Sequence, residues 1–170
     1  QTNIRVDQAI DDVLDAAGWP GLYNNEVLND SPVGYWRFGE SSGNAIDSSG
    51  NGNDGTVTGV TQGATGLLGG DSDTAYEFNG ASGDVDFGSP TEISDLFALG
   101  GASIEAVIKA DSDGEGNEGR IFDKTTWFLA VSNEAAGAMR LRFRHDTSLD
   151  FSQWSTTNRV INVGQAHHIA

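Results

Sequence analysis

The apolar positions of residues 2–21 recur with the period of a helix. They return at steps of three and four residues, at Val6, Ile10, Val13, Leu14 and Ala17. Aspartates occupy the opposite face, and Gly18 followed by Pro20 ends the pattern. A helix of this length is only marginally stable in isolation, so we expect it to pack against the following domain or against another chain.

From Ser31 onward the pattern changes to an alternation with period two, which is typical of strands. The alternating runs lie at residues 34–40, 74–80, 84–88, 102–111, 120–133 and 138–146. Clusters of Gly, Asn and Asp separate these runs, and no further helical segment with the spacing of a β-α-β unit follows. The pattern predicts an all-β domain, an antiparallel sandwich or barrel.

The stretch "IDSSGNGNDGTVTG" at residues 46–59 has three interpretations: a flexible linker, a cation-binding loop or a tight turn. Asn51-Gly52 and Asp54-Gly55 are dipeptides that accept the positive φ angles of tight hairpin turns. Strand signals resume at once with "TVTGV", whereas a linker would continue without them. The linker interpretation is therefore rejected.

The composition excludes several classes of function. A formal net charge of −16 and a pI near 4.2 make the surface repel phosphates, so we expect no nucleic-acid partner. No run of 18 apolar residues exists, so we expect no insertion into a membrane. Cysteine is absent, which removes disulfides and thiolate metal sites.

Four stretches of the sequence carry a resemblance: "YWRFGESSGNAIDSSGNGNDGTVTG" (35–59), "AYEFNGASGDVDFG" (75–88), "SIEAVIKAD" (103–111) and "HHIA" (167–170). In their order and spacing they resemble laminin-G-like domains of the concanavalin A-like lectin and glucanase superfamily. The resemblance implies an antiparallel jelly-roll β-sandwich over residues 31–170, preceded by a helix and linker over residues 1–30. In the family the last stretch lies in mid-domain, so we expect further strands to follow and these residues to be part of a longer polypeptide.

The segment "RVDQAIDDVLDAAGWP" (5–20) is similar to a segment of minor tail proteins of tailed phages. Together the two resemblances imply a non-enzymatic virion component, a minor tail or fibre protein anchored through residues 1–30. Host cell-surface glycans or other tail proteins are the expected partners, and the N-terminal segment is expected to form a homo-oligomer. The alternatives are a secreted or cell-surface bacterial adhesin and, less favoured, a glycanase.

Laminin-G-like domains often bind Ca²⁺, and the resemblance points to Asp47 with Asn51 and Asp54 as a structural calcium site. Ca²⁺ takes six to eight oxygen ligands, which carboxylates, amides and carbonyls of such a loop can offer. It is not an EF-hand, because position 12 counted from Asp47 is Thr58. The competing interpretation, which stays open, is that these side chains only bond their own backbone in Asx turns. A second acidic loop, at residues 111–118, is interpreted as solvated.

Two aspartates two positions apart, Asp84 and Asp86, face one side of a predicted strand. Paired carboxylates can serve in glycoside hydrolysis. The related glucanases use an alternating Glu-Asp-Glu strand, and Gly88 stands in the third position here. We therefore interpret both aspartates as an outward polar face and expect no catalytic residues.

Candidate ligand contacts come from one strand and from tryptophans. In "MRLRFRH" (139–145), apolar side chains alternate with Arg140, Arg142 and Arg144, which would stand roughly 7 Å apart on one face. This arginine row could bind anionic glycans, although pairing with acidic residues of neighbouring strands is the favoured interpretation. Trp127 and Trp154 are candidates for sugar stacking if they are exposed.

Overall fold

The computed structural model describes residues 22–69, 71–94, 96, 101–124, 126–146 and 151–170. Its regular secondary structure is mostly β, in antiparallel sheets, which confirms the all-β prediction at that level. It divides into two compact units, which we describe separately. The first extends to Glu77 and includes Asp84–Ile93, and the second comprises Phe78–Gly83 and Ser94–Ala170.

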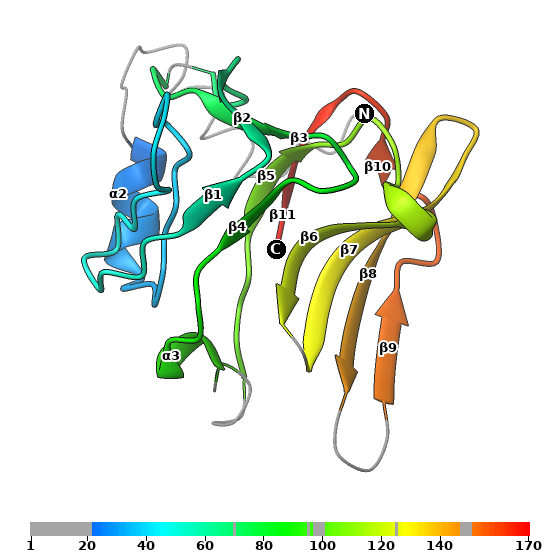
Figure 1. Cartoon of the computed structure of the whole chain (residues 1–170). Helices are drawn as coiled ribbons and strands as arrows, with labels where there is room; N and C mark the ends of the chain where they lie inside the picture. Colours follow the sequence, from blue (N-terminus) through cyan, green and yellow to red (C-terminus); the bar gives the residue numbers. More distant parts are fainter. Residues whose placement is uncertain (1–21, 70, 95, 97–100, 125, 147–150) are drawn as a thin grey trace, which may run out of the picture. The chain divides into compact units, whose positions relative to one another are not determined.

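The first unit combines short helices with two pairs of short strands (Figure 1). Helix α2 spans Leu22–Asn29 and helix α3 spans Thr91–Ser94. Strand β1 (Thr56–Thr58) pairs with β4 (Asp84–Asp86), and β2 (Val60–Ala64) pairs with β3 (Ala75–Phe78). Among the described residues, no helix has the length and apolar character needed to cross a membrane.

The helix predicted within residues 2–21 lies outside the described residues. Helix α2 was not predicted, because its sequence "LYNNEVLN" is short and has no clear amphipathic period. The helical structure that can be described therefore begins after the segment that the sequence pattern selected.

The prediction of a strand at residues 34–40 is wrong. The described backbone there forms only an isolated antiparallel bridge between Trp36 and Asp47. Phe38 has a φ of 58°, which lies in the left-handed region and breaks an extended strand. Its ring instead stacks on Tyr76 with centroids 4.5 Å apart, so packing of the aromatic side chain overrides the alternating pattern.

The second unit contains a five-stranded antiparallel sheet (Figure 1). Its strands are β6 (Glu118–Lys124), β7 (Trp127–Ala135), β8 (Ala138–Asp146), β9 (Phe151–Ser155) and β10 (Ile161–Asn162). The order is β10-β8-β7-β6, and β9 also pairs with β8. The single run predicted at 120–133 is in fact the hairpin of β6 and β7, whereas the run at 138–146 is confirmed as β8.

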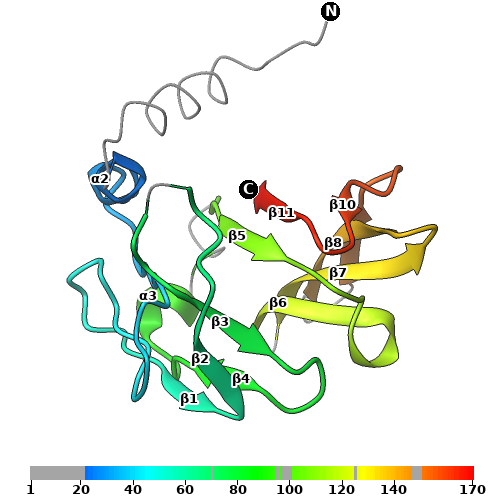
Figure 2. The same ribbon diagram turned by 90° about the horizontal axis from the view of Figure 1, so that it is seen from above.

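A second, smaller sheet packs on this one. It consists of β5 (Ala106–Lys109) and β11 (Ala166–Ile169), which lie antiparallel beside each other (Figure 2). A short 3₁₀ helix, η1 (Glu115–Asn117), precedes β6. The shared core contains Leu129, Val131, Met139, Leu141, Ile161 and Ile169. The expectation that the apolar positions of β8 face the core is confirmed, since Met139 is fully buried and Phe143 packs against this cluster.

Candidate functional site

The loop formed by residues 31–55 is organised around the carboxylate of Asp47, a residue that is 7% exposed. Its Oδ1 accepts hydrogen bonds from the backbone N–H groups of Tyr35 (3.0 Å) and Ser49 (2.9 Å). Its Oδ2 accepts one from the N–H of Asn53 (3.0 Å). One side chain thus satisfies three backbone donors that lie up to 18 residues apart in sequence, from 35 to 53.

Further bonds close the same loop. Ala45 and Gly55 exchange two backbone hydrogen bonds of 2.8 Å each, and the N–H of Asp47 donates to Oδ1 of Asp54 at 2.8 Å. Gly52 has a φ of 78°, as a tight turn requires. Gly55 has no positive φ. A Cβ there would lie 2.4 Å from the side chain of Val85, so close packing explains this glycine.

Asp47 is charged in the folded protein in spite of its burial. Burial by itself raises the pKa of this carboxyl, but the hydrogen bonds from Tyr35, Ser49 and Asn53 oppose burial and prevail. The net result is a pKa below the ordinary value of 3.8. The carboxylate therefore stabilises the fold at neutral pH and loses that contribution on acidification.

Of the three predicted calcium ligands, Asp47 and Asp54 are joined by a hydrogen bond, and all three make hydrogen bonds within the protein. Both oxygens of Asp47 face N–H donors, and one oxygen of Asp54 accepts the amide of Asp47. The amide nitrogen of Asn51 donates to the carbonyls of Pro32 (3.1 Å) and Val33 (3.2 Å). The carboxylate of Asp47 therefore accepts backbone N–H groups, whereas Ca²⁺ takes oxygen ligands. The geometry supports the Asx-turn interpretation, and calcium stays a prediction from the resemblance.

A second buried polar group lies in the same unit. The hydroxyl of Tyr76 donates to Oε2 of Glu40 at 2.8 Å and accepts from Gln62 at 2.6 Å. Burial, followed by the hydrogen bond to Glu40, raises the pKa of Tyr76 to about 12. The other oxygen of Glu40 accepts the N–H of Ile46 at 3.2 Å, which connects this group to the Asp47 loop.

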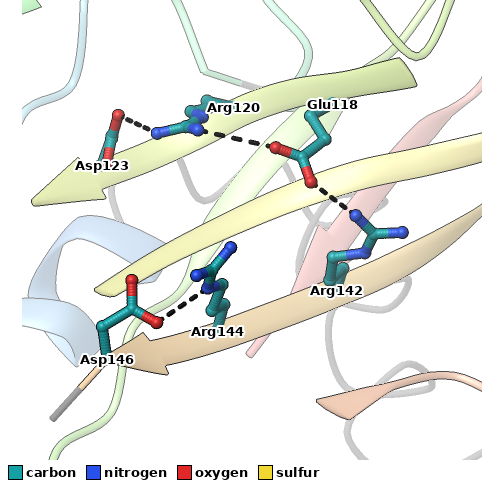
Figure 3. Close-up of polar contacts among 6 residues, drawn as sticks. All are labelled: Glu118, Arg120, Asp123, Arg142, Arg144 and Asp146. Carbon is teal, nitrogen blue, oxygen red and sulfur yellow. Dashed lines mark hydrogen bonds and ion pairs between the residues drawn. The ribbon is translucent and has the colours of Figure 1, made fainter. Parts of the chain in front are cut away.

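The arginine row lies on the face of β8 opposite the core, and each of its members already has a polar partner. Figure 3 shows the contacts of Arg142 and Arg144. Arg142 pairs with Glu118 at 2.5 Å, and Arg144 pairs with Asp146 at 2.8 Å. Arg140 donates to the backbone carbonyl of Thr156 at 3.2 Å. Only the pair of Arg142 and Glu118 joins two strands, as the favoured interpretation expects, because Asp146 lies on β8 itself and Arg140 contacts a carbonyl.

The pair of Arg142 and Glu118 reaches across a whole strand, because β7 lies between β6 and β8. Beneath the pair, β7 presents two small residues, Ala130 and Ser132, and both are 0% exposed. The row continues through Arg120 of β6, which contacts Glu118 at 3.5 Å and pairs with Asp123. Small side chains on the central strand therefore allow the charged side chains to close over it.

The two tryptophans predicted as sugar platforms have opposite environments. Trp127 is only 2% exposed and stacks on Phe122 with ring centroids 5.2 Å apart, so the interpretation of Trp127 as a ligand contact is wrong. A sugar cannot reach a ring that packs in the core. Trp154 on β9 is 58% exposed and borders an apolar hollow of about 330 Å³. The hollow is lined by Ala102, Ile104, Leu129, Leu141, Phe143, Trp154 and Ala170.

Asp84 and Asp86 are exposed on β4, on either side of the half-buried Val85. They stand opposite Thr58 and Thr56 of β1, and Asp86 accepts the N–H of Gly88 at 2.7 Å. Their placement agrees with an outward polar face. In the described parts of the chain, no three His, Asp or Glu side chains form a group that could hold a metal ion.

Comparisons with family models, with curated proteins and with solved structures returned no match for this chain. The interpretation of function therefore depends on the geometry described above and on the resemblances of the sequence.

We predict that Asp47→Asn destabilises the protein at neutral pH by about 1–3 kcal/mol, because a neutral amide replaces a charged acceptor of three N–H bonds. Chemical denaturation measures the loss. Asp84→Asn, at an exposed position, is the control and should change stability by less than about 0.5 kcal/mol.

The same variant should also change the pH dependence of stability. Since the pKa of Asp47 is lowered in the folded state, its contribution is present above about pH 4 and is lost as the pH falls through the folded pKa. Asp47→Asn should therefore unfold with a shallower acid dependence than the wild type. If added Ca²⁺ strongly stabilised the wild type but not the variant, the calcium interpretation would replace this one.

Double-mutant cycles should give different coupling free energies for the two ion pairs of the arginine row. The side chain of Arg142 is 18% exposed, whereas that of Arg144 is 37% exposed. We expect a coupling of about 0.5–1 kcal/mol for Glu118→Gln with Arg142→Met and nearly zero for Asp146→Asn with Arg144→Met, because solvent screens the more exposed pair. Equal coupling free energies would show that the contact across β7 is no stronger than the exposed pair of Arg144 and Asp146.

Proposed function

We propose that this protein is a non-enzymatic structural and adhesive component of a phage tail. In this proposal residues 31–170 belong to a laminin-G-like jelly roll, and residues 1–30 anchor the chain to the tail. The sequence resemblances to laminin-G-like domains and to minor tail proteins support both parts. The antiparallel sheets are compatible with such a fold.

The exposed indole of Trp154 carries the adhesive part of the proposal. An exposed tryptophan beside an apolar hollow offers a flat surface for the apolar face of a sugar ring. The adjacent residues of β9, Ser152 and Gln153, are exposed and can donate or accept hydrogen bonds. We therefore place the glycan contact at β9. The arginine row is less suitable because its side chains are already engaged.

The strongly acidic surface supports a partner other than nucleic acid. With a formal net charge of −16, the chain repels phosphate backbones and anionic polymers at long range. Neutral or cationic surface glycans, or neighbouring tail proteins, avoid this repulsion. A secreted or cell-surface bacterial adhesin remains the second candidate, because an exposed stacking tryptophan would serve it equally well.

Binding to immobilised bacterial surface polysaccharides tests the adhesive role. The wild-type chain should bind at least one of them, and Trp154→Ala should weaken that binding roughly tenfold through the loss of ring stacking. Val160→Ala removes another exposed apolar side chain of the same unit and should bind like the wild type. Unchanged binding by Trp154→Ala, or no binding by the wild type, would contradict the proposed contact.

The oligomeric state distinguishes a tail component from a free adhesin. We expect the wild-type chain to be a homo-oligomer in light scattering, and Ile10→Asp with Leu14→Asp to reduce its mass to that of the monomer. Both substitutions place a charge on the predicted apolar face of the N-terminal helix. Asp12→Asn on the opposite face is the control. A monomeric wild type would favour the adhesin.

A further inference from the structure

The chain contains two Asn-Gly dipeptides in its first 83 residues, and the structure gives their side chains opposite roles. Asn51-Gly52 and Asn79-Gly80 are both exposed, and both glycines have positive φ, 78° and 72°. A Cβ placed on either glycine would meet no atom within 4 Å. The space on the Cβ side of either glycine is therefore open, and glycine itself adds no side chain next to its backbone nitrogen.

Asn51 acts as a hydrogen-bond donor. Its Nδ2 donates to the carbonyl oxygens of Pro32 (3.1 Å) and Val33 (3.2 Å) and to Oγ of Ser49 (3.1 Å). Asn53 adds a parallel contact, from its Nδ2 to the same carbonyl of Val33 at 2.8 Å. The two amides attach residues 46–55 to residues 32–33, and this attachment requires N–H groups at position 51.

Asn79 acts mainly as an acceptor, and its Nδ2 makes one donation, to Oγ of Ser82 (3.2 Å). Its Oδ1 accepts the backbone N–H groups of Ala81 (2.9 Å), Ser82 (2.9 Å) and Gly83 (3.2 Å). A carboxylate at this position keeps an oxygen in the same place and accepts the same bonds. The turn after β3 can therefore tolerate the exchange of an amide for an acid.

We propose that Asn51-Gly52 is a site of spontaneous deamidation whose conversion releases residues 46–55 from residues 32–33, whereas conversion to aspartate at Asn79-Gly80 leaves its turn closed. The inference is independent of the proposed adhesive function. It rests on the chemistry of the dipeptide and on the direction of the side-chain hydrogen bonds.

The reaction needs only water and a base. The backbone nitrogen of Gly52 loses its proton and attacks Cγ of Asn51, so that a C–N bond forms, the Cγ–Nδ2 bond breaks and ammonia leaves. Water then opens the resulting succinimide at either carbonyl and yields aspartate or isoaspartate. An amide with two N–H donors is thereby replaced by a carboxylate that has none.

The product is incompatible with the contacts that Asn51 makes. A carboxylate directed at the carbonyls of Pro32 and Val33 places acceptors against acceptors, and the two bonds are lost. It also adds a third carboxylate to residues 46–55, which already hold those of Asp47 and Asp54. Only the contact of Asn53 then attaches the loop to Val33.

The experiment ages the full chain in mildly alkaline buffer and digests it with a protease that cleaves after glutamate. Residues 41–77 and 78–92 are then separate peptides, because Glu40, Glu77 and Glu92 mark their ends. Fragmentation in the mass spectrometer should locate the exchange of NH₂ for OH at Asn51 of the 41–77 peptide. An unchanged Asn51 after prolonged ageing would overturn the proposal.

Hydrogen exchange measures the structural consequence. In Asn51→Asp and in the aged wild type, the backbone amides of Tyr35, Ser49 and Asn53 should exchange roughly threefold to tenfold faster than in fresh protein. In the matched control Asn79→Asp these amides should exchange as in the wild type. Should Asn51→Asp fail to fold, the aged wild type supplies the same comparison. Equal exchange in aged and fresh wild type, or accelerated exchange in Asn79→Asp, would contradict the proposed release.

Discussion

A charge taken out of water must be surrounded by partners, and this constraint shapes both units of the protein. In the first unit the buried carboxylate of Asp47 accepts three backbone N–H groups and so determines the course of residues 35–53. In the second unit Arg142 and Glu118 meet above β7. The small side chains of Ala130 and Ser132 leave room for that contact. In both places the charged side chains hold parts of the backbone together, which is a structural role.

This constraint also limits where the protein can bind a ligand. Carboxylates and guanidinium groups that serve the fold are occupied, as the Asp47 loop and the arginine row show. The indole of Trp154 in the second unit is exposed and borders an apolar hollow. The proposed adhesive contact follows from this division between structural polar groups and an exposed aromatic surface.

The strand prediction was right where alternating burial decides the conformation. It was wrong where one residue takes a positive φ angle that breaks the strand. Residues 138–146 form β8 with the predicted bounds, because Met139, Leu141 and Phe143 face one core. Residues 34–40 alternate equally well, yet the positive φ of Phe38 and its stacking on Tyr76 remove them from any regular strand. The hairpin between β6 and β7 was missed because the connection between Lys124 and Trp127 is too short to contain a recognisable turn signal.

The sequence alone determined the antiparallel all-β class, the acidic surface and the identity of the loop around Asp47 as a turn. These depend on periodicity, charge and the glycines and asparagines themselves, which are local properties. Only the tertiary structure decided which tryptophan is exposed, which arginines are paired, and whether Asp47 faces N–H groups or open space. Those outcomes depend on contacts between residues far apart in the chain, such as Tyr35 with Asp47 and Glu118 with Arg142, and no local pattern encodes them.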